Sequence, residues 1–285
     1  MANFSTFFLY LSTQTGQLFT GAEQLLGGAL LGVLIAWLAY RAGTLSRSGG
    51  WAAALMGTII FGIGGLQWAV LLLTFFVSSS ALSRLFGRRK QQFEEKFSKG
   101  HRRDAGQVFA NGGIAMLIVL LRLWFPNAWW VWAAYAGALA AVNADTWATE
   151  LGVLNPNPPR LITTGKIVEG GTSGAVSPLG MLAALGGAAL LGIFAGALGG
   201  SGLLGFAVTL GGVAGSVCDS LLGATIQRIS FCPTCNKETE RTPLHTCGTP
   251  TVPLRGWLWL NNDWVNAACG LCGALVTLAL LVLLA

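Results

Sequence analysis

Acidic and amide side chains mark the end of a long apolar segment, residues 128–149. Asn143 and Glu150 share one face of a helix at this spacing, and Asp145 flanks that face. An ionisable group inside an apolar helix is costly, so it usually faces a cavity or a functional site. Carboxylates with few histidines favour a hard cation such as Mg²⁺, which binds through one or two carboxylates together with substrate phosphates.

A second apolar segment, residues 201–226, carries a stripe of small and polar residues at helical spacing. The stripe contains Gly212, Ser216, Asp219, Ser220, Gly223 and Gln227. A stripe that served packing alone would contain glycine and serine but would not require Asp219. Asp263 opens another apolar segment, and Asn111 follows Asp104 at helical spacing in a third. The sequence therefore predicts a polar chamber at one end of a helical bundle.

A loop rich in glycine, hydroxyl and basic residues lies between the segments at 128–149 and 174–198. Its candidate phosphate-binding residues are Arg160, Lys166, Glu169, Gly170, Gly171, Thr172, Ser173 and Gly174. Such a loop at a helix N-terminus can surround phosphate oxygens with backbone N–H groups, and arginine and lysine suit phosphate charge. The loop has no Walker A motif, and the alternative interpretation is a connection without a ligand.

Three cysteines and a histidine lie in the polar loop that follows residues 201–226. Cys232, Cys235, His245 and Cys247 have the spacing C-x2-C-x9-H-x-C, which is typical of a zinc knuckle or ribbon. A closed site with four protein ligands would hold a structural Zn²⁺. The alternative is a loop of reduced cysteines. A disulfide is less expected if the loop faces the reducing side of a membrane.

The composition indicates which kind of element must hold these residues. Of the 285 residues, 53% are hydrophobic and only 10% are charged, and the mean hydropathy is +0.63. So few charges cannot cover a folded chain of this length in water, which excludes a soluble enzyme, a disordered chain and a disulfide scaffold. The net charge of +6 is explained by basic loops of a membrane protein, so no nucleic-acid partner is expected.

The predicted fold is all-α: one polytopic domain over residues 1–285, with residues 229–256 as a Cys/His insertion loop. Eight apolar segments are expected to span a membrane, at 24–41, 51–65, 67–83, 105–124, 128–149, 174–198, 201–226 and 264–285. The second and third are joined by glycines, which predicts a tight hairpin or a re-entrant pair. The apolar run Phe7–Leu11 has no basic residue before it, so it is not expected to be a signal peptide.

The basic residues predict an orientation. Of the 17 lysines and arginines, all but Arg122 fall in the loops between segments one and two, three and four, five and six, and seven and eight. The positive-inside rule places these four loops in the cytoplasm and the N-terminus outside. The loop from Arg84 to Asp104 alternates basic residues with phenylalanines and is expected to lie on anionic lipid or to attract an anionic substrate.

Several motifs resemble an integral-membrane family that includes the plant phytyl-phosphate kinase of tocopherol synthesis. They are QVFANG at 107–112, NADTWATELG at 143–152, PRLITT at 159–164, GGTSG at 170–174, DSLLGA at 219–224 and NDWVN at 262–266. The resemblance covers nearly the whole chain. The layout is more distantly similar to dolichol and phytol kinases and to CDP-diacylglycerol synthases. The cysteine loop is not part of the resemblance.

The resemblance implies a membrane enzyme that uses CTP, or another nucleoside triphosphate, and Mg²⁺ to phosphorylate a prenyl monophosphate on the cytoplasmic side. Asp145 and Asp219 would bind Mg²⁺, and Glu150 and Asp263 would complete the catalytic set. The expected nucleotide and phosphate contacts are Asn111, Asn143, Arg160, Lys166, Glu169, residues 170–174, Ser220, Gln227 and Arg228. The alternatives are a cytidylyltransferase that forms a CDP-lipid and a lipid or small-molecule transporter. The sequence does not predict an oligomeric state.

Overall fold

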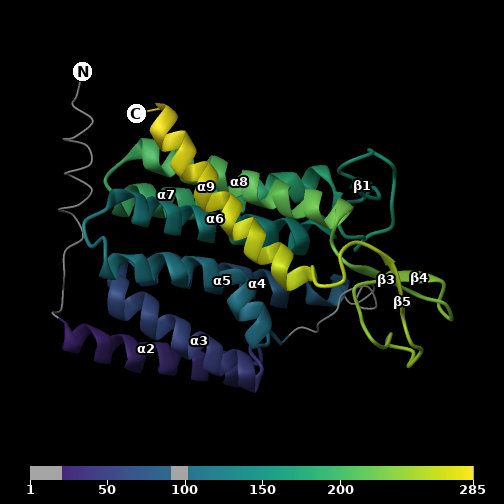
Figure 1. Cartoon of the computed structure of the whole chain (residues 1–285), viewed down its shortest axis with the longest axis horizontal. Helices are drawn as coiled ribbons and strands as arrows, with labels where there is room; N and C mark the ends of the chain where they lie inside the picture. The colour runs from purple at the N-terminus through teal and green to yellow at the C-terminus, as the bar shows by residue number, and fades with distance from the viewer. Residues whose placement is uncertain (1–20, 91–101, 285) are drawn as a thin grey trace.

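The structure, a computed structural model, describes residues 21–90 and 102–284, and within them the fold is all-α as predicted (Figure 1). The eight α-helices are α2 (Ala22–Arg41), α3 (Arg47–Ile59), α4 (Leu66–Lys90), α5 (Ala105–Leu120), α6 (Trp129–Gly152), α7 (Pro178–Leu198), α8 (Gly202–Thr225) and α9 (Asn262–Leu284). A π-helical turn, η1 (Ile60–Gly64), extends α3, and a 3₁₀ turn, η3 (Leu121–Leu123), extends α5. The predicted apolar run Phe7–Leu11 lies outside the described residues.

Six helices are long and apolar enough to cross a membrane: α2, α4, α5, α7, α8 and α9. The other two correspond to the second and fifth predicted segments. Helix α3 has only 13 residues before the π-helical turn, and α6 is buried over most of its length. Helix α6 packs against α4, α5, α7, α8 and α9, so it forms the centre of the bundle.

Two predicted boundaries differ from the structure. Residues 174–177 do not begin α7, because Ser177 caps the helix by accepting a hydrogen bond from the Gly180 N–H, and Pro178 takes the first helical position. The predicted basic loop is also shorter, because α4 continues to Lys90. Residues 91–101 of that loop lie outside the described chain.

Small residues allow the central helices to approach closely. A Cβ atom on Gly212 of α8 would lie 2.9 Å from the Cβ of Ala140 in α6, and one on Gly273 of α9 would lie 2.6 Å from the carbonyl oxygen of Gly137. In a membrane, this close packing replaces the hydrophobic driving force that water provides. The glycines of the α8 stripe therefore have a packing role, and they bring α8 and α9 against the polar end of α6.

The predicted turn between the second and third segments is tight, but the two helices then separate. Gly65, with a φ of +89°, connects η1 to α4. From there α3 packs on α2 and α5, whereas α4 packs on α6 and α7. The separation leaves an apolar pocket between α2, α3, α4 and α5.

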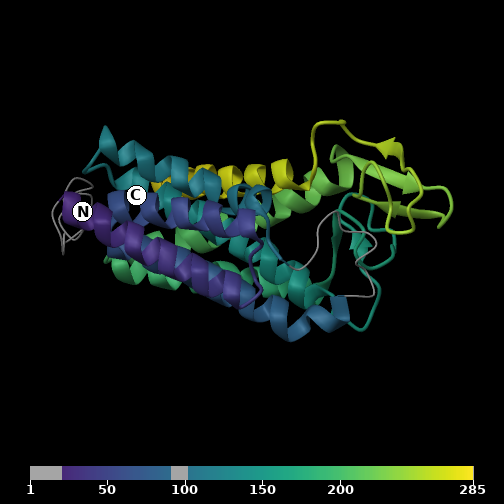
Figure 2. The same cartoon turned by 90° about the horizontal axis from the view of Figure 1, so that it is seen from below.

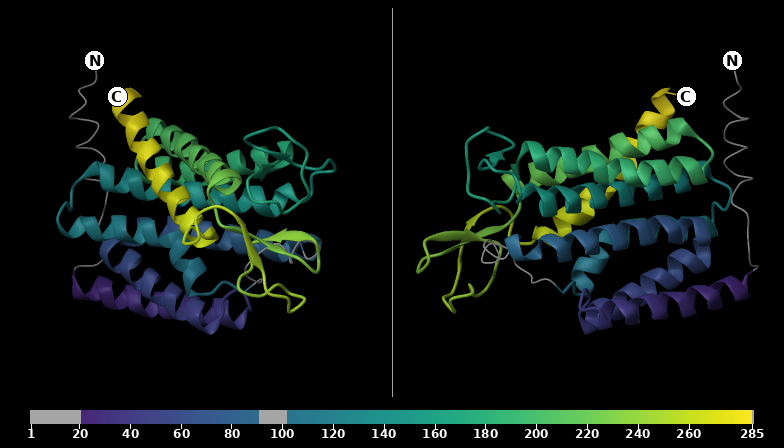
Figure 3. Two further views of the ribbon diagram at one scale, coloured as in Figure 1. Left: turned by 45° about the vertical axis from the view of Figure 1, so that its right-hand side comes forward. Right: turned by 180° about the vertical axis from the view of Figure 1, so that it is seen from behind.

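The connections at one end of the bundle are long and contain all the strands (Figures 1 and 2). The loop after α6 is closed by the antiparallel pair β1 (Arg160–Leu161) and β2 (Ala175–Val176). The segment between α8 and α9 folds into a ribbon of β3 (Ile229–Cys232), β4 (Lys237–Thr239) and β5 (Val252–Arg255), in the order β4-β3-β5. We call this side the loop end; Figure 3 shows the ribbon projecting beyond the helices there.

Candidate functional site

Two aspartates from different helices lie within electrostatic reach of each other at the loop end. Asp145 in α6 and Asp219 in α8 lie close enough for their charges to repel each other. Both also lie within electrostatic reach of the Cys269 thiol in α9. Within the described chain, the buried Oδ2 atom of Asp219 accepts no hydrogen bond. A buried carboxylate oxygen without a donor, next to a second carboxylate, suits a cation, which would satisfy both groups.

The ribbon between α8 and α9 adds a third carboxylate to this pair. Glu240, which follows β4, is half-buried and lies close enough to Asp219 for charge repulsion. Its Oε1 accepts a hydrogen bond of 2.8 Å from Nε2 of Gln227. Glu240 lies in a polar segment of the sequence without helical periodicity, and the fold of the ribbon turns it toward the helices.

Gln227 joins the ribbon to the glycine-rich loop. Its Oε1 accepts a hydrogen bond of 2.8 Å from the Ser173 hydroxyl, and its side chain is only 1% exposed. Gly174, with a φ of +80°, packs directly on the backbone of Ala224 at the end of α8. A Cβ atom on Gly223 would lie 2.8 Å from the Ser173 hydroxyl. These contacts place residues 173–174 of the loop on the last turn of α8, two turns or less after Asp219.

The basic residues of that loop lie farther out. Arg160 and Lys166 are exposed, and Nη1 of Arg160 donates to the carbonyl oxygen of Gly165 at 2.8 Å. Glu169 is also exposed, and its backbone carbonyl accepts a hydrogen bond of 2.7 Å from the Thr172 hydroxyl. These contacts close the loop as a compact turn at the surface. Roles for these residues in phosphate binding remain predictions.

A second polar cluster connects α4, α5 and α6. Ser83 donates a hydrogen bond of 2.9 Å to Oε1 of Glu150, which is 5% exposed. Arg103 precedes α5, donates to the Ser79 hydroxyl at 3.2 Å and lies within the electrostatic reach of Glu150. Burial lowers the pKa of the Arg103 guanidinium, and the charge of Glu150 partly opposes that change. Glu150 thus lies in a polar cluster with an arginine, one and a half turns from Asp145.

Three further polar residues form hydrogen bonds within the protein. Asn143 is fully buried, accepts a hydrogen bond from Ser78 at 3.1 Å and donates to the Gly187 carbonyl at 2.8 Å. Asn111 donates to the carbonyl of Gln107, one turn earlier in α5. Asp104 is the N-cap of α5 and forms a capping box with Gln107. Asn143 therefore joins α4, α6 and α7, and its predicted contact with a nucleotide remains untested.

The remaining candidates lie around the ends of α8 and α9. Asp263 is in the first turn of α9, and Ser220 is half-buried beside Asp219 in α8. Nη1 of Arg228 donates to the carbonyl oxygen of Leu258 at 2.9 Å, in the connection to α9. Arg255, which the sequence did not single out, donates to the carbonyl of Gly223 at 2.9 Å. Arg255 therefore fastens the ribbon to the end of α8, and Arg228 fastens it to the connection that leads into α9.

The four cysteine and histidine side chains predicted to bind a metal come together in the ribbon. The ligand atoms of Cys232, Cys235, His245 and Cys247 all lie within 4.8 Å of one another. Cys247 is 3.6 Å from Cys232 between sulfur atoms and 3.3 Å from Nδ1 of His245. Hydrogen bonding with Thr249 and His245 lowers the pKa of the Cys247 thiol to about 6.

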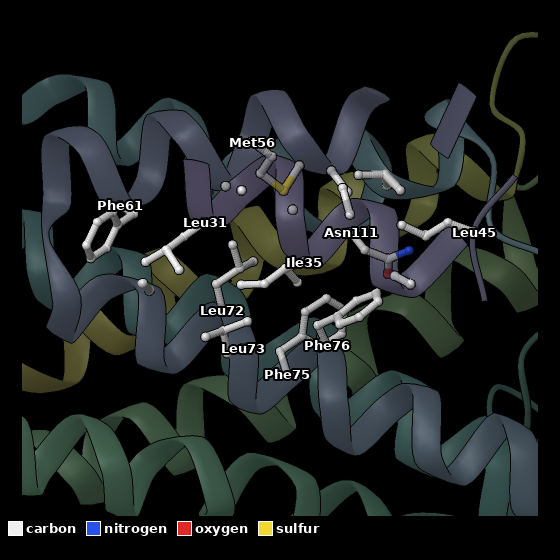
Figure 4. Close-up of a pocket in the computed structure, with 18 of the residues that line it drawn as sticks. Leu31, Ile35, Leu45, Met56, Phe61, Leu72, Leu73, Phe75, Phe76 and Asn111 are labelled. Carbon is white, nitrogen blue, oxygen red and sulfur yellow. The ribbon is translucent and has the colours of Figure 1, made fainter. Parts of the chain in front are cut away.

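The pocket between α2, α3, α4 and α5 has a volume of about 120 Å³ and is lined almost entirely by apolar residues. Figure 4 shows Ile35, Leu72 and Phe75 among its walls, with Asn111 toward one end. Arg103 and Gln107 also line the pocket. The apolar space therefore has a polar and basic edge, and Arg103 belongs both to this edge and to the cluster around Glu150.

Sequence patterns missed Glu240, Arg103 and the serines of α4. Glu240 sits among exposed ribbon residues in a segment without helical periodicity, so its position depends on strand pairing. Arg103 belongs to a run of basic residues that resembles an orientation signal. The triple serine at 78–80 was the available signal, because three hydroxyls in an apolar segment suggest polar partners across the helix interface.

Comparisons with known proteins agree with this architecture. The chain matches the model of a family described as integral membrane protein DUF92 over residues 30–274. It is 35% identical over 270 residues to Protein PGR of Arabidopsis thaliana, covering 85% of this chain and 91% of that protein. It is 36% identical over 184 residues to an uncharacterized membrane protein of Methanocaldococcus jannaschii, covering 65% of this chain and 75% of the relative.

A third relative is an uncharacterized membrane protein of Synechocystis, 27% identical over 231 residues, covering 80% of this chain and 79% of the relative. No solved structure matches the chain. The family match and the plant relative confirm the predicted resemblance to an integral-membrane family with a plant member. The chain belongs to the integral membrane protein family DUF92.

Proposed function

We propose that this protein is a membrane-embedded kinase that transfers a phosphoryl group from CTP to a prenyl monophosphate, giving the diphosphate. The observation that carries the proposal is the meeting of Asp145 and Asp219 beside the glycine-rich loop, at the basic end of an apolar bundle. Carboxylates, phosphate-binding backbone and an apolar pocket are the three parts such a reaction requires. The resemblance to the phytyl-phosphate kinase family supplies the nucleotide and the substrate class.

In this proposal, Asp145 and Asp219 hold Mg²⁺. The unsatisfied Oδ2 atom of Asp219, within the part of the chain that the structure describes, fits a cation. Mg²⁺ supplies charge neutralisation for the triphosphate when bound. The chain contributes the anionic pair itself, and the packing of α6 on α8 fixes the separation of the two carboxylates. Glu150, from the neighbouring polar cluster, and Asp263, from the first turn of α9, would complete the acidic set.

The phosphate groups would lie against the glycine-rich loop. Gly170 and Gly171 would offer backbone N–H groups to phosphate oxygens, while Gly174 packs on α8 and Ser173 is oriented by Gln227. Arg160 and Lys166 provide the positive charge that attracts the nucleotide to this end of the bundle. No protein nucleophile is needed, because an oxygen of the lipid phosphate can attack the γ-phosphorus in line while CDP leaves.

The pocket between α2, α3, α4 and α5, with a volume of about 120 Å³, would hold the few carbons of the prenyl chain that lie next to the phosphate. Its apolar walls exclude water from a hydrocarbon chain, while Arg103 at the polar edge matches the negative charge of the lipid phosphate. Arg103 and Glu150 attract each other, so the edge of the pocket is joined to α6, which also carries Asp145. This connection directs the phosphate end of the lipid toward the carboxylates.

The proposal is tested with purified protein, CTP, Mg²⁺ and a series of prenyl monophosphates, with CDP and pyrophosphate both measured. The proposal expects CDP and a prenyl diphosphate in equal amounts. Pyrophosphate with a CDP-lipid would instead identify a cytidylyltransferase, because the α-phosphorus would then be attacked. If no nucleoside triphosphate is consumed with any substrate, the kinase proposal fails, and a transporter becomes the better interpretation.

A further inference from the structure

The cysteine and histidine cluster of the ribbon has the dimensions of a tetrahedral metal site. Ligand atoms at 2.0–2.3 Å from a zinc ion are about 3.4–3.8 Å from one another in a tetrahedron. In the ribbon, Cys247 Sγ lies 3.3 Å from Nδ1 of His245 and 3.6 Å from Sγ of Cys232. The whole set, including Cys235, stays within 4.8 Å.

The backbone of the ribbon explains why the ligands converge. Cys232 ends β3, and Cys235 lies in the turn to β4, where Asn236 adopts the left-handed conformation with a φ of +53°. His245 and Cys247 come from the β4–β5 connection, which folds back so that the His245 N–H donates to the Thr249 carbonyl at 2.9 Å. His245 is 4% exposed, and Cys232 is fully buried. Two separate turns thus supply two ligands each.

The residues around the cluster do not form an apolar core that would hold the ribbon together. The ribbon has only 11 residues in strands, and Val252, Leu254 and Leu244 are about half exposed. Small folds of this kind generally need a disulfide or a metal for stability. The structure forms no disulfide among the cysteines of the cluster, so a bound ion is the stabilising link that these residues fit.

We propose that Cys232, Cys235, His245 and Cys247 bind one structural Zn²⁺, and that this ion holds Glu240 in place beside Gln227 and Asp219. The first part, the metal site, does not depend on the proposed kinase reaction. The second part rests on that reaction only where activity is measured. Glu240 begins the β4–β5 connection five residues before His245, so a metal that fixes His245 also restricts the carboxylate.

Zinc is measured first by elemental analysis of protein purified without chelators. The wild type should carry about one zinc per chain, and Cys232→Ser and His245→Ala should each fall below about 0.1. Cys272→Ser, in α9, is the matched control and should keep the metal. Wild-type protein without zinc, and with Cys232, Cys235 and Cys247 reacting as free thiols, would overturn the proposal. A disulfide within the cluster would overturn it as well.

The positioning role is tested by hydrogen exchange, which needs no activity. Removing zinc from the wild type should raise amide exchange at β3 and β4 at least about tenfold, and re-addition should restore protection. Glu240→Gln should retain zinc and ribbon protection, since it leaves the ligands intact, while lowering kinase turnover if the proposed reaction is correct. Unchanged exchange after complete metal removal would rule out the positioning role. Loss of zinc together with normal kinase turnover would separate the metal site from the reaction.

Discussion

At the scale of single residues, the site depends on charges that the fold forces together. Asp145 and Asp219 are 74 positions apart in the sequence and lie on different helices. Their carboxylates repel each other unless a cation is present. Such an arrangement costs stability, which favours a role in cation binding over a role in packing. Within the described residues, the buried Oδ2 atom of Asp219 has no hydrogen-bond donor, which is the source of part of that cost.

Replacing either aspartate by asparagine should reduce turnover at least about a hundredfold. The change keeps size and hydrogen bonding but removes the charge that holds Mg²⁺, and metal-assisted stabilisation is worth several kcal/mol. The fold should survive, since the mutation also relieves the repulsion between the two groups. Steady-state kinetics with CTP and a prenyl monophosphate would measure the loss.

The control for this prediction is Asp104→Asn. Asp104 caps α5, and asparagine is an equally good capping residue, so turnover should change less than about threefold. If Asp104→Asn abolishes turnover while Asp145→Asn and Asp219→Asn do not, the assignment of the site is wrong.

At the scale of elements, the backbone of the glycine-rich loop packs on α8 at Gly174. Gly174 combines a left-handed backbone with direct contact to Ala224, whereas Gly165 has a φ of +67° and no neighbouring atom within 4 Å of its added Cβ. Substitution of Gly165 therefore tests the cost of the left-handed backbone alone, whereas substitution of Gly174 tests that cost together with a steric clash.

Gly165→Ala should cost about 1 kcal/mol of stability, the price of a left-handed residue. Gly174→Ala should cost about 3 kcal/mol, because the added methyl group must also displace the backbone of α8. Thermal unfolding of both variants in detergent would compare them. Equal losses would show that the loop does not pack on α8 as the structure has it.

The apolar pocket makes a second prediction at this scale. Ile35 lines the pocket, whereas its neighbour Leu34 is 49% exposed on the outside of α2. Ile35→Trp should raise the KM for a twenty-carbon prenyl phosphate about tenfold, because the indole fills space that the chain needs. Leu34→Trp should leave KM unchanged. A similar KM for both variants would place the prenyl chain elsewhere.

Much of this arrangement followed from sequence patterns, for identifiable reasons. Hydropathy located the eight helices within residues 21–90 and 102–284, because a long apolar segment in a membrane has few alternatives to a helix, and the polar stripe of α8 indicated that Asp219 faces a neighbour. The spacing of the cysteines indicated their meeting in the ribbon. Glu240 and Arg103 could not be found, because their positions depend on how the ribbon and the α4–α5 connection fold over the helix ends. The separation of α3 from α4 was equally hidden, since neither helix has a sequence pattern that identifies its neighbours.

At the scale of the whole molecule, the ends of the bundle differ in charge. Among the lysines and arginines within 21–90 and 102–284, only Arg122 lies away from the loop end, where it donates to the Gly64 carbonyl at 2.8 Å. We expect the loop end to face the cytoplasm, because the membrane potential and the translocation machinery favour retention of basic loops there.

Membrane-impermeant thiol reagents would test this orientation in sealed inside-out vesicles. Cysteines introduced at Arg89 and Lys237 should react, and one at Trp124, which is 69% exposed at the opposite end, should not. Mass spectrometry of the labelled peptides distinguishes them from native cysteines. Reaction at Trp124 alone would reverse the orientation, and reaction of Arg89 and Lys237 from opposite sides would refute the eight-helix topology.

The side-chain amide of Gln227 couples the proposed binding of CTP to the proposed binding of Zn²⁺. Its oxygen accepts a hydrogen bond from Ser173 in the glycine-rich loop, and its nitrogen donates one to Glu240 in the ribbon. A nucleotide that reorients Ser173 would therefore also change the hydrogen bond to Glu240. Linkage then works in both directions: whatever factor CTP contributes to zinc affinity, zinc must contribute to CTP affinity. Measuring zinc release to a chelator with and without CTP, in the wild type and in Gln227→Ala, would give that factor. A single buried side chain would thus make the metal content of the ribbon a sensor of nucleotide occupancy.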